Sequence, residues 1–261
     1  MVYWGRVNDD VFETCVNTFR KYSNALLQVH TDNKPKLTKN YNIDWQIVSS
    51  KKVKKRRALC KIELLKKVVD KLKDGDRILV ADVDLYFMAD PFDVFENPFD
   101  LAVTTRSHEY RYPINGGVFF LRINKYTREF VDFYLEQCLK PNWRPLKEFR
   151  FNVGHYVYNP DWEIGQDFLC AYWMYWMARH SIDVFDAGFK WNFCPNTDHY
   201  GLKKAKEILR KAYEEKFVKI LHLKSELKYC IYDGWLEDVI IHKGGLKEWN
   251  WYEKYKDKPF V

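Results

Sequence analysis

The prediction of the fold begins with the stretch Arg77-Ile-Leu-Val-Ala-Asp82-Val-Asp84. Its apolar part is short and nearly unbroken, which is typical of a buried strand in a parallel sheet. Open α/β sheets bind ligands just beyond the carboxyl ends of such strands. Residues two apart on an extended chain share one face, so Asp82 and Asp84 can hold a hard divalent cation through oxygen ligands. The alternative interpretation is that the pair belongs to a solvated turn or caps a helix.

Before this stretch, short apolar runs alternate with longer runs whose apolar residues recur every three or four positions. The expected elements are a strand at Val2–Val7, a helix at Asp9–Tyr22, strands at Ala25–His30 and Trp45–Ser49, and a helix at Arg57–Lys73. This alternation of strands and helices predicts a parallel, doubly wound sheet for the first part of the chain.

After Asp84 the pattern predicts a more mixed set of elements, beginning with a short helical turn around Pro91. The expected strands are Leu101–Thr105, Gly117–Arg122, Ile182–Asp186 and Val218–Leu223. The expected helices are Tyr126–Cys138, Gln166–Arg179 and Leu202–Tyr213, with a loop at Pro141–Asp161 and an irregular stretch at Phe189–Gly201. No repeat or low-complexity linker divides the chain, so we expect one mixed α/β domain.

The composition indicates a globular protein with a substantial core, because 47% of the 261 residues are apolar. Aromatic residues make up 18% of the chain, and aromatic rings serve as platforms for sugars and bases as well as core material. The formal net charge of +7 is partly concentrated in Lys51–Arg57 and Lys203–Lys206. A basic balance favours anionic partners such as nucleic acid, a membrane surface or a phosphorylated substrate. Solvated helix faces or loops explain each cluster equally well.

The six cysteines occur singly, without a CxxC pair, which is typical of buried thiols in a reducing compartment. The N-terminus lacks the apolar core of a signal peptide, and no stretch approaches the ~20 apolar residues of a membrane helix. We therefore expect a soluble, cytoplasmic protein without a transmembrane segment. Peripheral contact with a membrane stays open.

The two acids and the residue between them, Asp82-Val83-Asp84, resemble the DxD motif of glycosyltransferases with the GT-A fold. The resemblance implies an α/β, Rossmann-like fold with a mixed, mostly parallel sheet flanked by helices. It also implies that these three residues bind the diphosphate of a nucleotide sugar, with Mn²⁺ (or Mg²⁺) held by the two carboxylates. One domain, 1–261, is then expected, with a nucleotide-binding half at about 1–100 and an acceptor half at about 101–261.

A second motif, Asn115-Gly116-Gly117-Val118, resembles the N-x-G-V strand entry of glycosyltransferase family 8 and related retaining enzymes. The resemblance implies that Asn115 contacts the donor sugar and that Gly116 lies in the same binding site. Glycine lets the backbone approach a ligand closely, and an amide offers donors and an acceptor to hydroxyls. The alternative interpretation is a plain Asn-Gly turn before a strand.

A third motif, Gly165-Gln166-Asp167, resembles the family's D-Q-D segment, with Gly165 in place of the first acid. In the family this segment lies at a loop-to-helix junction near the reacting anomeric carbon. The resemblance therefore implies that Gln166 and Asp167 are the catalytic residues. The alternative interpretation is that Asp167 stabilises the first turn of its helix through the macrodipole.

A fourth motif, His222-Leu-Lys-Ser225-Glu-Leu-Lys228, resembles the family's C-terminal H-x-x-G-x-x-K-P-W segment. The resemblance implies that His222 is the third metal ligand, beside Asp82 and Asp84, and that Lys228 binds the diphosphate. Ser225 stands where the family has Gly, and the Pro-Trp pair is missing. Imidazole suits Mn²⁺ better than Mg²⁺.

The resemblance also implies positions for the rest of the nucleotide sugar. In family members a Lys or Arg on the helix before the DxD strand reaches the donor phosphates or sugar. Lys61 is the first candidate for this role and Arg57 the second. Residues just after the first strand hold the nucleobase, which selects Tyr3, Trp4, Val7 and Asn8. Asp32 follows the second predicted strand and is a candidate for the base or ribose, or for an ordinary turn.

The expected function is metal-dependent transfer of a sugar from a nucleotide diphosphate sugar to a hydroxyl of a glycan or glycoconjugate. The family resemblance favours a UDP-hexose donor and retention of configuration, while the missing acid at Gly165 keeps inversion open. A sugar-nucleotide nucleotidyltransferase is an alternative, but Gly5–Asp10 has one glycine and two acids where a Gly-rich basic loop is expected. A non-catalytic nucleic-acid-binding protein would rest on Lys51–Arg57, which carries no aromatic residue or recognised fold motif. A non-catalytic sugar-binding module is a further alternative, but it would have no need of the diphosphate site that the DxD motif and the segment His222–Lys228 imply.

Overall fold

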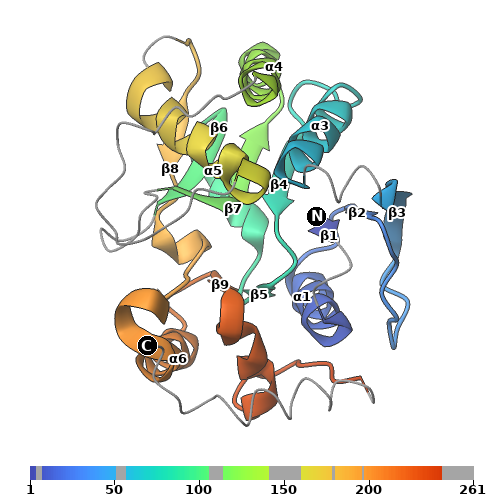
Figure 1. The fold of residues 1–261 in the computed structure, drawn as a ribbon, viewed down its shortest axis with the longest axis vertical. Coiled ribbons are helices and arrows are strands. Elements are labelled where there is room, and N and C mark those ends of the chain that lie inside the picture. The colour runs from blue at the N-terminus through green and yellow to red at the C-terminus, as the bar shows by residue number, and fades with distance from the viewer. Residues whose placement is uncertain are drawn as a thin grey trace. The chain divides into compact units, whose positions relative to one another are not determined.

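The computed structural model describes residues 1–3, 8–50, 57–105, 114–140, 160–177, 180–195 and 197–242 (Figure 1). The chain forms two compact units, each assembled from separated segments. The first unit comprises the described residues of Met1–Ile47, Ala81–Asp93 and Phe189–Val261, and the second those of Val48–Val80 and Val94–Gly188. Among the described residues, no helix is both long and apolar enough to cross a membrane.

The first unit contains a parallel sheet with the strand order β1-β2-β3. These strands are β1 (Val2–Tyr3), β2 (Leu27–Thr31) and β3 (Ile43–Ile47). The predicted parallel arrangement of these three strands is therefore confirmed, although β2 begins two residues later and β3 two residues earlier than the sequence patterns indicated. The strand at Arg77–Ala81 was expected in the same sheet, and that part of the prediction is wrong, because this strand pairs in a separate sheet. Residues 4–7 of the first predicted strand lie outside the described residues.

Helix α1 (Asp9–Tyr22) has the predicted bounds because both ends are set by local hydrogen bonds. The Asn8 side chain accepts from the Asp10 N–H at 2.9 Å, which caps the first turn. At the other end, the Ser23 N–H donates to the Phe19 carbonyl. Of the predicted apolar face, Phe12, Cys15 and Phe19 are buried, whereas Tyr22 is 37% exposed.

The first unit also holds a short antiparallel pair, β5 (Leu85–Phe87) and β9 (Ile220–His222), which aligns Leu85 with His222. Strand β5 was not predicted from the sequence, and only the pairing with β9 reveals it. The stretch predicted as irregular, Phe189–Gly201, contains a 3-10 turn, η5 (Phe189–Trp191), and the start of α6 (Thr197–Glu215). Helix α6 is kinked at Gly201, whose φ of 71° is accessible to glycine, and this kink explains why the regular pattern began only at Leu202.

After β9, the 3-10 helix η6 (Ser225–Asp233) packs against α6. A buried cluster of apolar side chains joins the two elements. This packing fixes the segment that follows His222.

The second unit contains a mixed sheet with the order β4-β7-β6-β8. Its strands are β4 (Arg77–Ala81), β6 (Leu101–Thr105), β7 (Ile114–Arg122) and β8 (Val184–Asp186). Strand β6 runs antiparallel to β7 and parallel to β8. Between β5 and β6 lies the predicted helical turn, the 3-10 helix η1 (Pro91–Glu96).

Three helices pack together on the second unit: α3 (Arg57–Val69), α4 (Lys125–Leu139) and α5 (Pro160–Ala171), followed by a π-helical turn, η3 (Tyr172–Trp176). Figure 1 shows α5 crossing the sheet near β7, which it contacts. Helix α5 was predicted to start at Gln166, which is wrong, because it begins at Pro160. Proline is well suited to the first position of a helix, where its missing N–H costs no hydrogen bond. The rest of the predicted loop, 141–159, lies outside the described residues.

Candidate functional site

The acidic pair lies on the link between two strands of different sheets. Strand β4 ends at Ala81 and β5 begins at Leu85, so Asp82, Val83 and Asp84 form the whole connection. Val83 is buried, which anchors the middle of the link. The Leu223 N–H donates to the Asp84 carbonyl at 2.7 Å and ties the link to the residue after β9. The backbone of the acidic pair is therefore held from both sides.

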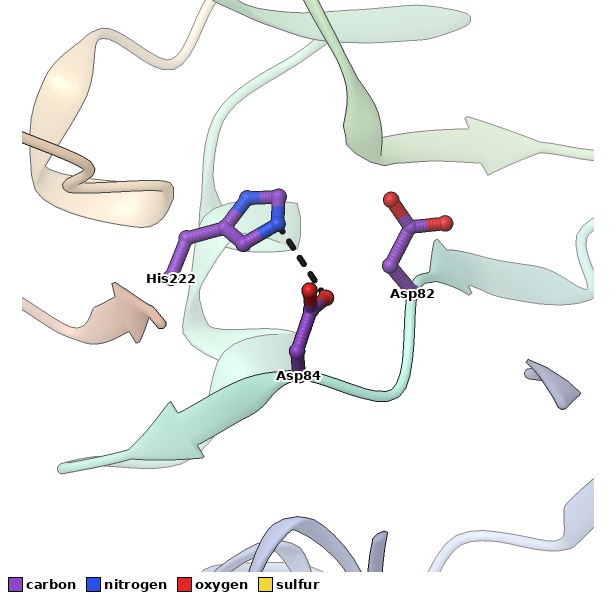
Figure 2. Close-up of side chains that lie close together, drawn as sticks. All are labelled: Asp82, Asp84 and His222. Atoms are coloured by element: carbon purple, nitrogen blue, oxygen red, sulfur yellow. Dashed lines mark ion pairs between the residues drawn. The ribbon is translucent and has the colours of Figure 1, made fainter. Parts of the chain in front are cut away.

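His222 is the last residue of β9, and the pairing of β9 with β5 brings it beside the acidic pair (Figure 2). Its Nε2 atom lies 3.2 Å from Asp84 Oδ1. Asp82, Asp84 and His222 each offer one ligand atom, and the three atoms all lie within 4.8 Å of one another. The structure thus brings together the three residues that the sequence predicted as metal ligands.

A lysine adds positive charge to this group from η6. Lys228 Nζ lies 3.6 Å from Asp84 Oδ2, and the Lys228 side chain is 29% exposed. Burial alone raises the pKa of Asp84, but the charge and hydrogen bond of His222 and the charge of Lys228 outweigh it. The pKa of Asp84 therefore lies below its ordinary value, and the group is a carboxylate at neutral pH.

One polar contact of His222 comes from a residue that sequence reasoning did not select. Asn192 Oδ1 lies 2.9 Å from His222 Nδ1, and both residues are buried. Asn192 belongs to the stretch predicted as irregular. Its proximity to His222 arises from pairing between distant segments, and no local sequence pattern signals it.

The residues predicted to hold the nucleobase have contacts of their own in the first unit. Tyr3 is buried, and its hydroxyl donates to Asp9 Oδ1 at 3.0 Å. The side chain of Asn8 caps α1 and donates from Nδ2 to the hydroxyl of Tyr232 at 2.8 Å. Trp4 and Val7 lie outside the described residues. Hence Tyr3 and Asn8 shape the start of α1.

Asp32 directly follows β2, at the carboxyl end of this parallel strand. Its Oδ1 atom is buried and accepts no hydrogen bond within the described part of the chain. A buried acceptor without a partner is costly unless another group supplies the hydrogen. Asp32 is therefore suited to accept a hydrogen bond from a ligand.

The second unit gathers a separate set of predicted residues. Lys61 Nζ donates to the Gly116 carbonyl at 3.2 Å, and the Gly116 N–H donates to Gln166 Oε1 at 3.4 Å. Asn115 is buried, and its Oδ1 accepts from the Gly117 N–H at 3.0 Å. Gly116 thus links the helix before the acidic strand with the third motif. Arg57, the second choice on that helix, is its first residue.

The third motif lies inside α5, so its predicted place at a loop-to-helix junction is wrong. Because α5 begins at Pro160, Asp167 lies beyond the first turn, and the predicted effect of Asp167 on the N-terminus of the helix is wrong as well. Asp167 is 2% exposed, whereas Gln166 is partly accessible. Of the two residues, Gln166 is better placed to meet a ligand.

The glycine at the first position of this motif has a packing explanation. A Cβ at Gly165 would lie 2.8 Å from the hydroxyl oxygen of Tyr134, which donates to the Gly165 carbonyl. The Tyr134 ring is stacked on Phe168 at a centroid distance of 4.2 Å, so it cannot easily move away. Any larger residue at 165, including an acid, would meet this ring.

No family model matches this chain, and no curated protein matches it in sequence. Among solved structures, it is similar to the glycosyltransferase GlyE of Streptococcus pneumoniae TIGR4, with 15% identity, a TM-score of 0.52, and coverage of 99% of this chain and 65% of GlyE. It is also similar to the bifunctional glycosyltransferase WbbM in its apo form, with 12% identity, a TM-score of 0.52, and coverage of 95% of this chain and 50% of WbbM.

The chain thus spans less than two thirds of the length of either protein. At these identities the likeness concerns the fold. This chain has the mixed α/β GT-A fold of these glycosyltransferases, as the sequence predicted.

Proposed function

We propose that this protein is a metal-dependent glycosyltransferase that moves a sugar from a nucleotide diphosphate sugar to a hydroxyl of a glycan or glycoconjugate. The observation that supports this most strongly is the convergence of Asp82, Asp84 and His222, whose ligand atoms lie within 4.8 Å of one another. It occurs in a chain with the fold of glycosyltransferases, at the end of the strand where such folds bind ligands. The proposal includes the retaining, family 8-like character that the motifs indicate.

The three residues fit a divalent cation by their chemistry. Two carboxylate oxygens and one imidazole nitrogen suit Mn²⁺, and the imidazole favours it over Mg²⁺. The lowered pKa of Asp84 keeps that ligand anionic without bound metal. A cation bound here would neutralise the negative charge that develops on the diphosphate as it leaves.

Lys228 provides a fixed positive charge for the same diphosphate. Its ammonium lies beside the carboxylate of Asp84, and part of its side chain is accessible. Asp32 is proposed to accept a hydrogen bond from the ribose or the base, because its buried Oδ1 finds no donor among the described residues. Tyr3, Val7 and Asn8 are proposed to complete the base site, with UDP as the preferred nucleotide.

For the donor sugar we propose the residues around Gly116 in the second unit. Asn115 and Lys61 offer donors to hydroxyl or phosphate oxygens, and Gln166 offers an amide beside the anomeric carbon. The burial of Asp167 favours a supporting role for its carboxylate, with Gln166 in contact with the sugar. Retention is proposed from the resemblance of the motifs to family 8, and the packing at Gly165 explains only why the family's first acid is absent.

We also propose that 1–261 forms one glycosyltransferase domain, with nucleotide binding centred on about 1–100 and acceptor binding on about 101–261. His222 and Lys228 are then a contribution of the later part of the chain to the diphosphate site. The interleaved segments of the first unit, which include both ends of the described chain, support that contribution.

The function is tested by thermal shift and hydrolysis assays with UDP-, GDP- and dTDP-sugars, each with and without Mn²⁺. We expect one nucleotide to stabilise the protein, and to do so mainly when Mn²⁺ is present. Asp84→Ala should remove both the stabilisation and the hydrolysis. As a matched control, Asp74→Ala deletes an exposed acid that pairs only at the surface with Arg128, and it should behave like the wild type. If none of the nucleotides shifts the melting temperature, the proposed function is wrong.

A further inference from the structure

The hydrogen bond between Asn192 and His222 joins two buried side chains at the candidate metal site. The two atoms, Asn192 Oδ1 and His222 Nδ1, are 2.9 Å apart. Asn192 is 2% exposed and His222 is 3% exposed. A buried polar pair of this kind strongly restrains both partners, because separating them leaves polar atoms without partners.

The backbone fixes the position of Asn192 relative to His222. The Asn192 N–H donates to the Phe189 carbonyl and closes the turn of η5. The next residue, Phe193, brackets β9, since its N–H donates to the Ile220 carbonyl at 2.9 Å and its carbonyl accepts from the His222 N–H at 2.8 Å. The segment therefore lies alongside β9 in a parallel bridge. His222 is held between this segment on one side and β5 on the other.

The chemistry of the pair determines which ring nitrogen of His222 carries the proton. An amide oxygen only accepts hydrogen bonds, so the contact with Asn192 Oδ1 places the hydrogen on Nδ1. Without metal, the other nitrogen, Nε2, faces the Asp84 carboxylate and donates to it. A cation in that place would take the Nε2 lone pair, because Nδ1 keeps its own proton on Asn192. Nε2 is the nitrogen that lies 3.2 Å from Asp84 Oδ1, among the three converging ligand atoms.

We propose that Asn192 is a positioning residue for His222: it fixes the ring orientation and the Nδ1–H tautomer, so that the Nε2 lone pair faces the metal position. The proposal rests on the proposed function, since it requires a divalent cation at Asp82, Asp84 and His222. Groups that hold the second nitrogen of a metal-bound histidine typically affect metal affinity about 10–100-fold. An amide turned the other way, with Asn192 Nδ2 donating to Nδ1, would give the opposite tautomer and no such effect.

The test measures the Kd of Mn²⁺ for the full chain by electron paramagnetic resonance, with and without UDP. Asn192→Ala removes the acceptor and should raise the Kd about 10–100-fold. Asn192→Asp keeps an acceptor that cannot donate, and its Kd should stay within about threefold of the wild-type value. The matched control is Asn17→Ala, which deletes a hydrogen bond from another asparagine of the first unit, to the Asp238 carbonyl. It should bind Mn²⁺ like the wild type.

The outcomes separate this inference from the proposed function. A wild-type protein that binds no Mn²⁺ would overturn the metal site itself and the role of Asn192 with it. If the wild type binds Mn²⁺ and folded Asn192→Ala binds equally well, only the role of Asn192 is wrong. Should Asn192→Ala fail to fold, Asn192→Asp decides, because a large loss of Mn²⁺ affinity in the folded aspartate variant contradicts the acceptor role. Nitrogen-15 NMR of His222 without metal gives an independent readout, and an Nδ1 atom without a proton in the wild type contradicts the proposal.

Discussion

Two groups of side chains in the first unit have the same composition and different surroundings. Each holds two carboxylates and one imidazole: Asp82, Asp84 and His222 in the strand-end cluster, and Asp10, Glu13 and His242 in the helix cluster. In the strand-end cluster the three ligand atoms converge within 4.8 Å. Within the described residues it is the one group of three such side chains that converges this closely.

In the helix cluster, fixed donors of the protein already occupy the carboxylates. Glu13 accepts from the backbone N–H and the hydroxyl of Thr38, and its Oε2 lies 2.6 Å from His242 Nε2. Asp10 accepts from the Tyr232 hydroxyl at 2.5 Å. These contacts join α1 to the segments around Thr38 and His242, so this cluster stabilises the fold.

The comparison shows that residue type alone does not distinguish a site from a structural anchor. What differs is the exposure of the acids and the convergence of their ligand atoms on one point. In the strand-end cluster the acids converge on a common point beside a partly exposed lysine, Lys228. In the helix cluster, Asp10 and Glu13 are both 0% exposed. Function and stability should therefore separate cleanly when each cluster is changed in turn.

The largest effect is expected for Asp84→Asn, which removes the anionic ligand of the strand-end cluster. The Mn²⁺ Kd should rise more than about 100-fold, because loss of a metal ligand costs more than loss of a residue that only holds a ligand in place. Mn²⁺-dependent donor turnover should fall to background. The melting temperature in EDTA should change by only a few degrees. Metal titration and a thermal scan measure both quantities. If this variant binds Mn²⁺ with wild-type affinity, the strand-end cluster is not the metal site, and its proposed difference from the helix cluster is wrong.

The reciprocal change is Glu13→Gln in the helix cluster. It removes the charged acceptor of Thr38 and the partner of His242, so the free energy of unfolding should fall by about 2–3 kcal/mol. The Mn²⁺ Kd should remain unchanged. Urea denaturation measures the loss. The matched control is Glu215→Gln, which breaks the exposed pair with Lys211 and should cost less than about 0.5 kcal/mol. A loss of metal affinity in Glu13→Gln would contradict the separate roles.

A smaller effect is expected in the dependence of stability on pH. Burial raises the pKa of Glu13, but hydrogen bonds from Thr38 and Tyr41 and the charge of His242 outweigh it, so the pKa lies below its ordinary value. A lowered pKa in the folded state means that Glu13 contributes its full stability above the unfolded value of about 4.3 and loses it as the pH falls through the lower folded value.

The predicted loss of stability at low pH can be checked by urea denaturation of the wild type and Glu13→Gln between neutral pH and about pH 3. The wild type should lose stability more steeply below about pH 4.3, and the two curves should converge at low pH. The other titratable groups facing Glu13, which are Asp10, Tyr41 and His242, remain in both proteins, so the difference reports Glu13 together with its coupling to them. Parallel curves would show that Glu13 does not titrate as inferred.

The sequence predicted elements well where local hydrogen bonds and periodicity define them. Helix α1 and strand β6 have the predicted bounds, because caps and apolar patterns act within a few residues. Strand β5 was missed because a run of three residues becomes a strand only by pairing with β9, far along the chain. The start of α5 at Pro160 was missed because its aromatic and proline residues resembled a loop.

The candidate site divides in the same way. Motif similarity selected Asp82, Asp84 and His222, and the fold brings them together. Asn192 and the helix cluster carry no motif, because their partners are set by tertiary pairing between distant segments. A sequence pattern therefore finds the ligands more readily than the residues that hold them.

Gly165 extends the comparison to a motif position where packing, and not chemistry, sets the residue type. Gly165→Ala should lower the free energy of unfolding by about 1 kcal/mol, because the crowding by the Tyr134 hydroxyl exceeds the gain in helix propensity. In a Tyr134→Phe background the crowding atom is absent, and the next contacts of the new Cβ would be ordinary, at 3.6 Å or more. There the same change should be neutral or stabilising.

Urea denaturation of the two single variants and the double variant gives the coupling between these sites. An equal cost of Gly165→Ala in both backgrounds would mean that Tyr134 does not exclude a side chain at this position. The absence of an acid at Gly165 would then reflect the chemistry of the site. A coupling of about 1 kcal/mol would instead show that the packing of α4 against α5 requires glycine at this position. The residue would then have a structural role, like the acids of the helix cluster.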